Sequence, residues 1–146
     1  RHLGFPIVGS VTTRKPRAED IGYTYLTFEE FQKQDLLEKS TYAGHHYGTR
    51  RQDVDNLKGP VVKAMDIVGA LHTRTAYPDC VLVFVKRPKE KIIKDILLRD
   101  VSIEDKVNRI CTLEQEYSNE KFADFVLENN GTIESAVKAL KDYLAK

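Results

Sequence analysis

The sequence has almost no net charge and no long apolar run, and each shortage excludes a class of protein. The formal net charge is +1 at pH 7 over 146 residues, which argues against binding to nucleic acid or an acidic membrane surface through an overall positive field. The longest apolar runs, such as residues 80–85, are far shorter than the roughly 20 residues needed to cross a bilayer. We therefore expect no nucleic-acid or membrane partner, and any phosphate must be bound by locally placed cations.

Cysteine and histidine are also scarce, and their spacing argues against a metal site. The two cysteines, Cys80 and Cys111, lie in an apolar run and on an expected helix, which predicts reduced core thiols in a cytoplasmic protein. His45 and His46 are adjacent, so on an extended segment their side chains point apart, and no third ligand is spaced to join them. We interpret this pair as histidines of a tight turn and predict no metal ligands in the protein.

The remaining composition is that of one folded domain, with 41% apolar residues and 31% charged residues. Hydrophobic patterning predicts strands at 3–11, 21–26, 36–43, 61–67, 80–85 and 125–127. Helices are predicted at 28–34, 50–57, 69–76, 89–98, 102–117 and 132–144, with Thr27, Thr49, Ser102 and Thr132 as N-caps. Strands that alternate with helices in the second half favour an α/β fold with a parallel sheet.

Residues 10–17 form a loop with two arginines three positions apart, Arg14 and Arg17. A planar guanidinium offers paired donors that fit phosphate oxygens, and two such groups held close together make a dianion site. Pro16 between them stiffens the loop, so little order is lost on binding. The alternative interpretation is a solvated basic turn, since Lys15 lies between the two arginines.

A carboxylate and two hydroxyl groups follow this loop, at Glu38, Tyr47 and Thr49. Guanine presents N–H donors beside its O6 acceptor, so one carboxylate and one hydroxyl would satisfy that edge, whereas adenine would leave them mispaired. The alternative for Glu38 is an exposed strand carboxylate paired with Lys39. Thr49 is also the expected N-cap of the next helix, and its hydroxyl could accept from the helix while donating to O6.

Several motifs follow one another in a fixed order: Ser-x-Thr-Thr-Arg-x-Pro-Arg, Gly-x-x-Tyr, Leu-Glu, Gly-x-x-Tyr-Gly-Thr and Asp-x-x-Gly. In this order the chain resembles the guanylate kinases over nearly its whole length. The resemblance implies a P-loop-kinase-like parallel sheet with flanking helices, a small β-rich GMP-binding insert at about 20–50 and a lid at about 98–110. It implies phosphoryl transfer from ATP to GMP, with Mg²⁺ arriving on ATP, in a cytoplasmic monomer or homodimer.

The resemblance also assigns roles to single residues. It places Ser10, Arg14, Arg17, Tyr23 and Tyr47 at the GMP phosphate, and Glu38, Thr49 and Asp66 at the base. It makes Arg99 and Arg109 catalytic cations of the lid, and places Arg99 and Asn129 at ATP. The alternatives are helix-surface charges for the two lid arginines and a plain turn around Asn129. Tyr25 has no match and is interpreted as a packing residue.

Three departures from the family pattern bear on turnover. No Gly-x-x-x-x-Gly-Lys-Ser/Thr phosphate cradle occurs in the sequence, so we expect an absent N-terminal strand and P-loop and no kinase activity from these 146 residues alone. Ala64 replaces the first Asp of the Asp-x-Asp pattern, and Val68 replaces a usual Gln. One alternative is a non-catalytic guanylate-kinase-like module that binds GMP or a phosphorylated protein partner. Another is a related kinase with a different acceptor.

Overall fold

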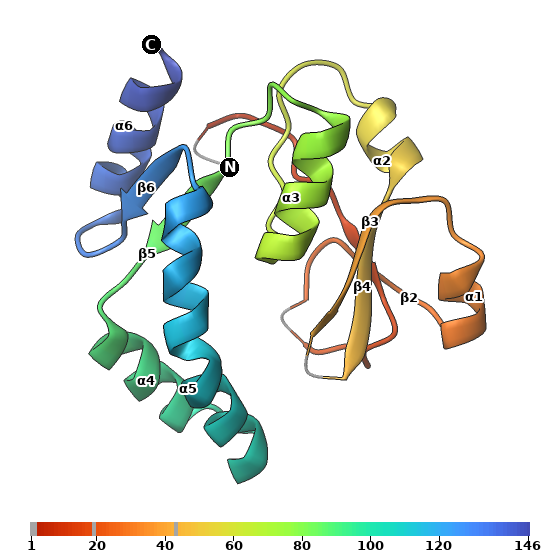
Figure 1. Cartoon of the computed structure of the whole chain (residues 1–146), viewed down its shortest axis with the longest axis horizontal. Coiled ribbons are helices and arrows are strands. Elements are labelled where there is room, and N and C mark those ends of the chain that lie inside the picture. The colour runs from red at the N-terminus through yellow and green to blue at the C-terminus, as the bar shows by residue number, and fades with distance from the viewer. Residues whose placement is uncertain (1–2, 19, 43) are drawn as a thin grey trace. The chain divides into compact units, whose positions relative to one another are not determined.

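The computed structural model describes residues 3–18, 20–42 and 44–146. The chain divides into two compact units, Arg1–Cys80 and Val81–Lys146, and each is described by itself (Figure 1). Both units contain strands and helices, as the predicted α/β class requires. No helix in the described ranges is long and apolar enough to span a membrane.

The first unit is built on a four-stranded sheet with the order β2-β1-β4-β3. Its strands are β1 (Ser10–Thr12), β2 (Tyr23–Tyr25), β3 (Leu36–Tyr42) and β4 (His45–Arg50). β1 runs parallel to β2 and antiparallel to β4, and β3 and β4 form an antiparallel hairpin. The sheet of the first unit is therefore mixed, and most of it lies in the segment of about 20–50 that the sequence predicted as a small β-rich insert.

The register of this sheet brings polar side chains into two rows on one face. Residues paired across strands share a face, and so do residues two apart along a strand. Ser10 pairs with Tyr23, Thr12 with Tyr25 and with Tyr47, and Glu38 with Thr49. The β1–β4 register, continued by one residue beyond Val11 and Gly48, sets Ser10 opposite Thr49. The first row is Tyr23, Ser10, Thr49 and Glu38, and the second is Tyr25, Thr12, Tyr47 and Ser40.

Three helices complete the first unit: α1 (Phe28–Gln32), α2 (Arg51–Asp55) and α3 (Ile67–Ala76). The predicted capping box at Thr27 and Glu30 is confirmed at the start of α1. The predicted Thr49 cap is wrong: Arg50 is the N-cap of α2 and makes no side-chain cap bond, because Thr49 lies inside β4 with its hydroxyl turned to Glu38. α3 packs against β3.

Two further local predictions in this unit are wrong. Residues 61–67 form no strand; Val62 makes one isolated parallel bridge with Ile7, and α3 begins at Ile67 because Asp66 caps it. His45 and His46 lie in β4, with the hairpin turn before them. The His46 ring packs against Phe28 and Phe31, at centroid distances of 4.9 and 5.6 Å, so burial of the ring explains its place in the strand.

The second unit has a parallel strand pair, β5 (Val83–Lys86) and β6 (Phe125–Glu128), as strand–helix alternation predicted. Its helices are α4 (Lys89–Leu98), α5 (Ile103–Ser118), the 3₁₀ turn η1 (Asn119–Phe122) and α6 (Ile133–Leu144). The predicted caps at Ser102 and Thr132 are confirmed. α4 packs against α5, and α6 against β6.

Candidate functional site

The base end of the candidate site is a buried carboxylate–hydroxyl pair. Thr49 Oγ1 donates to Glu38 Oε1 at 2.6 Å, and the two residues are 0% and 6% exposed. They come from neighbouring strands, so the sheet ladder fixes their separation. Because Thr49 donates its single hydroxyl proton to Glu38, the pair presents only hydrogen-bond acceptors to a ligand. The predicted donation from Thr49 to a guanine O6 is therefore not the arrangement of this structure.

The second oxygen of Glu38 lies against the first turn of α3. A Cβ built on Gly69 would come within 2.7 Å of Glu38 Oε2, so only glycine lets the helix approach the carboxylate this closely. Asp66, the N-cap of α3, accepts from the Gly69 N–H at 2.9 Å. The structure thus brings Glu38, Thr49 and Asp66 together. Among the described residues, nothing donates a hydrogen bond to Glu38 Oε2.

Burial and a set of nearby charges determine the acidity of Glu38. Burial raises the pKa of its carboxyl above the usual range, because a low-dielectric setting disfavours the charged form. The Thr49 hydrogen bond and the charges of Lys63 and His72 act the other way, while Asp66 raises the pKa further. Burial and Asp66 thus favour the neutral form of Glu38, while Thr49, Lys63 and His72 favour the ionised form.

The phosphate end of the candidate site begins with Arg14, which is 7% exposed. Its Nη2 forms an ion pair with Asp20 at 2.9 Å, and its Nη1 donates to the Lys15 carbonyl at 2.8 Å. The guanidinium lies over the Tyr23 ring, 5.2 Å from the centroid. The Asp20 hydrogen bond, and to a lesser degree Tyr47, raise the pKa of Arg14. Asp20 and the Lys15 carbonyl each take one of its five N–H donors, and Tyr47 also interacts with the guanidinium.

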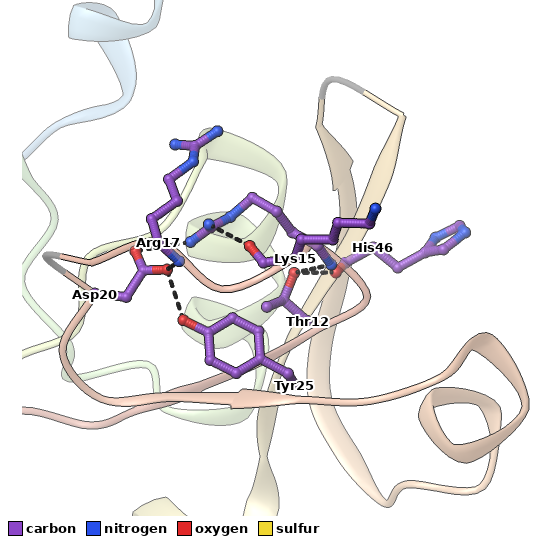
Figure 2. A network of polar contacts seen from close by, with 7 residues as sticks. Thr12, Lys15, Arg17, Asp20, Tyr25 and His46 are labelled. Carbon is purple, nitrogen blue, oxygen red and sulfur yellow. Dashed lines mark hydrogen bonds and ion pairs between the residues drawn. The ribbon is translucent and has the colours of Figure 1, made fainter. Parts of the chain in front are cut away.

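Asp20 organises the rest of the arginine loop, as Figure 2 shows. Its Oδ2 accepts from the Arg17 backbone N–H at 2.8 Å and from the Tyr25 hydroxyl at 2.6 Å. The Arg14 and Tyr25 bonds lower the pKa of the Asp20 carboxyl far below its usual range. Only the backbone of Arg17 is tied, and its residue is exposed to solvent. The loop therefore presents one guanidinium held by an ion pair and one exposed to solvent.

Three polar residues at the candidate site were not predicted from the sequence. Asp20 was not singled out, although an acid three residues after Arg17 and before Gly22 is typical of a side chain that caps a turn. Tyr25 was interpreted as a packing residue, which is wrong because its hydroxyl donates to Asp20. Lys63 donates to the Ser10 hydroxyl and to the Gly9 carbonyl. The signal for Lys63 was a lone charge inside the otherwise apolar run 61–65.

Comparison with known proteins supplies a family. The family model described as Guanylate kinase matches residues 2–146. The chain belongs to the guanylate kinase family. A guanylate kinase of Shouchella clausii is 32% identical over 144 residues, which cover 90% of this chain and 70% of that protein. One of Gloeobacter violaceus is 34% identical over 107 residues, covering 66% of this chain and about half (52%) of that protein.

A solved structure agrees with the family at the level of the fold. The crystal structure of guanylate kinase from Anaplasma phagocytophilum matches with a TM-score of 0.76 and 22% identity, covering 97% of this chain and 74% of that one. At this identity the likeness concerns the fold alone. The mixed α/β architecture of a guanylate kinase is therefore shared by this chain.

The other predicted site residues of this guanylate kinase family member lie in the second unit. Arg99 is the exposed C-cap of α4, and Arg109 lies within α5, where its charge acts on Glu116. Asn129 follows β6, and its backbone N–H donates to the Lys86 carbonyl at 2.7 Å. These positions agree with the predicted helix end, helix and turn. Their roles at ATP stay predictions.

No group of three or more potential metal ligands occurs among the described residues. In a nucleotide kinase the magnesium ion is part of the substrate, because the phosphate oxygens of ATP supply most of its ligands. Such a kinase therefore needs no metal site formed by protein side chains alone.

Proposed function

We propose that the polar face of the first unit binds GMP as the acceptor in phosphoryl transfer from MgATP, giving ADP and GDP. The observation that carries the proposal is the Glu38–Thr49 pair, an all-acceptor surface in the same cross-strand row as Ser10. Adjacent strands lie roughly 4.8 Å apart, so the three strands from Ser10 to Glu38 span a distance of the size of one nucleotide. Residues of about 20–50 form the GMP-binding insert in this proposal.

At the base end, guanine offers the donors that this surface lacks. Its N1–H and 2-amino group donate to Glu38 Oε2 and to the Thr49 oxygen, and Asp66 lies close enough to add its charge. Adenine carries an acceptor at N1, which would face the carboxylate and leave both groups unpaired. Such a mismatch discriminates strongly, because buried polar groups without partners are costly.

At the other end, the GMP phosphate meets the remaining donors of Arg14 and the exposed guanidinium of Arg17. Ser10 and Tyr47 add hydroxyl groups from the neighbouring strands, and Tyr23 adds a third beside Arg14. Because Asp20 already holds Arg14 in place, little order is lost when the phosphate binds. Arg17 supplies the movable cation that closes on the ligand.

The transfer step requires cations that stabilise charge on the moving phosphoryl group, since this chemistry rests mainly on positioning and electrostatics. We assign this role to Arg99 and Arg109, with Asn129 beside the adenine of ATP. Mg²⁺ enters with ATP and neutralises charge on its phosphates. The phosphate-cradle motif is not among these 146 residues, so the acceptor half of the reaction is the part that the described residues can carry.

Calorimetric titration of the 146-residue chain with GMP, IMP and AMP tests the acceptor assignment directly. We expect GMP to bind, IMP to bind more weakly because it lacks the 2-amino donor, and AMP to give no response. A phosphoserine peptide serves as the competitor that a phosphoprotein-binding module would prefer. Equal binding of AMP and GMP, or binding of the peptide alone, would contradict the proposal.

A further inference from the structure

Lys63 connects the two ends of the candidate site. It lies in the segment before α3, is half-buried, and its Nζ donates to the Gly9 carbonyl and to Ser10 Oγ at the start of β1. Its charge also acts on Glu38, at the far end of the same cross-strand row. No role in the nucleotide site followed from the sequence pattern for this residue.

Burying a lysine at this position costs free energy, so packing alone does not explain why a lysine lies there. Burial lowers the pKa of Lys63, and the carboxylates of Glu38 and Asp53 only partly oppose this. Both hydrogen-bond acceptors of Nζ are neutral, so they satisfy its donors without neutralising its charge. A methionine would fill a similar volume without this desolvation penalty.

The Lys63 bond fixes what Ser10 can do. An ammonium group only donates, so Ser10 Oγ is the acceptor in this contact. Its own hydroxyl proton is then directed to a further acceptor on the same face, beside the Arg14 cluster. An anionic ligand there meets a hydroxyl that is already oriented as a donor and polarised by a cation.

The same lysine supplies positive charge to the base end. The groups that act on Glu38 are Thr49 from β4, Asp66 and His72 from α3, and Lys63 from the segment before α3. Among these, Lys63 and His72 are the cations, and the exposed His72 is the more strongly screened by solvent. Lys63 is therefore the main counter-charge to the buried carboxylate.

We propose that Lys63 is a positioning residue of the nucleotide site, which orients the Ser10 hydroxyl toward the phosphate and supplies positive charge between the two ends of the site. The inference rests on the proposed function, because it assigns Lys63 to the GMP site. In this proposal a single side chain acts on both the phosphate end and the base end of the site.

The first experiment needs no ligand. The Glu38 carboxyl resonance, assigned by its loss in Glu38→Gln, is followed by carbon-13 NMR against pH in the wild type, Lys63→Met, Lys63→Gln and Lys63→Arg. We expect the midpoint to rise by about one pH unit in the two neutral variants, as for loss of a nearby opposite charge. Lys63→Arg should stay at the wild-type midpoint. Lys39→Met is the matched control, because Lys39 adjoins Glu38 in β3 but points to the opposite face.

The second experiment measures GMP binding and the coupling of Lys63 to Ser10. We expect Lys63→Met to weaken GMP binding about tenfold at pH 8 and by a larger factor at lower pH, because loss of the cation raises the pKa of Glu38 further. Ser10→Ala should weaken binding in the wild type but have little further effect in Lys63→Met, since the orienting lysine is already gone. A purely structural lysine would give additive losses and an unchanged pH profile.

The outcomes separate this proposal from the proposed function. If the wild type binds no GMP, the proposed function fails, while a shifted Glu38 midpoint still supports the charge role of Lys63. If GMP binds but both neutral variants keep the wild-type midpoint and pH profile, the Lys63 proposal is overturned. Loss of the folded state in both neutral variants, judged by circular dichroism, would also overturn it in favour of a structural lysine.

Discussion

The two ends of the candidate site are built in different ways. The base end is assembled by regular structure: two adjacent strands place Glu38 against Thr49, and α3 closes on them at Gly69. The phosphate end lies on the loop between β1 and β2 and is held by the charge of Asp20 on Arg14. Strand pairing thus fixes the groups that we propose to discriminate between bases, and an ion pair holds the group that we propose to attract an anion.

The carboxyl groups of the two ends also differ, because their pKa values are shifted in opposite directions. Burial raises the pKa of Glu38, whereas hydrogen bonds from Arg14 and Tyr25 lower the pKa of Asp20. An ionised Glu38 therefore opposes folding at neutral pH, and an ionised Asp20 favours it. In the proposed site, the ionised carboxyl of the base end therefore opposes folding, while that of the phosphate end favours it.

The sharpest way to break the base end is Glu38→Gln. The amide keeps the size of the side chain but turns a donor toward the guanine N–H groups, so a favourable charge-assisted bond becomes a mismatch. We expect GMP affinity to fall about 100-fold, or about 2.7 kcal/mol, with little change for AMP. Titration calorimetry measures GMP binding, and competition of AMP against bound GMP gives the ratio. Glu29→Gln, an exposed carboxylate on α1, is the control, and an unaltered GMP:AMP ratio in Glu38→Gln would remove Glu38 from the base site.

At the phosphate end, Arg17→Ala should weaken all phosphorylated ligands without changing the preference for guanine. The loss of one charge-assisted bond costs about 1.5–3 kcal/mol, which is roughly 10- to 150-fold in dissociation constant. Lys15→Ala is the matched control, since Lys15 is an equally exposed cation of the same loop. Equal losses in the two variants would mean that the loop attracts phosphate only by its general charge.

A methyl group at Gly69 tests how tightly the base end is packed. The new Cβ would meet Glu38 Oε2 at 2.7 Å, and the carboxylate can move away only by stretching its 2.6 Å bond to Thr49. We expect Gly69→Ala to reduce GMP affinity about tenfold, about 1.4 kcal/mol, and to leave Arg17-dependent phosphate binding intact. Gly131→Ala, a glycine of the second unit whose Cβ would meet only the Ser135 hydroxyl, serves as the control.

Much of the architecture was predictable because local chemistry agreed with the fold. The capping residues Thr27, Ser102 and Thr132 marked helix starts that the structure contains. Thr49 failed as a cap because the buried carboxylate of a neighbouring strand competes for its hydroxyl. Such competition is invisible in a linear pattern, since it depends on a pairing between residues 11 positions apart.

The candidate site was predictable in its residue types but not in its internal contacts. Motif order pointed to Glu38 and Arg14, and the structure places each within a polar network. The sequence did not reveal that Asp20 and Lys63 hold these networks together, because each acts through a tertiary contact with no characteristic spacing. Lys63 reaches Ser10 across 53 positions, a separation at which only the folded sheet decides which side chains meet.

The opposite pKa shifts at the two ends give the smallest and most discriminating effect, a pH-dependent change in stability. A carboxyl group whose pKa is raised in the folded state stabilises the fold below its unfolded-state pKa of about 4.3, and this stabilisation is lost as the pH rises. A carboxyl group whose pKa is lowered in the folded state stabilises the fold above its unfolded-state pKa of about 3.9, and this stabilisation is lost in acid. The melting temperature of Glu38→Gln, taken relative to that of the wild type, should increase as the pH rises from 4 to 7.5. Asp20→Asn should lose melting temperature over the same range and converge with the wild type in acid. Thermal unfolding followed by circular dichroism at a series of pH values measures both differences. Changes in melting temperature of the same sign in the two variants would show that Glu38 and Asp20 do not affect stability in opposite directions.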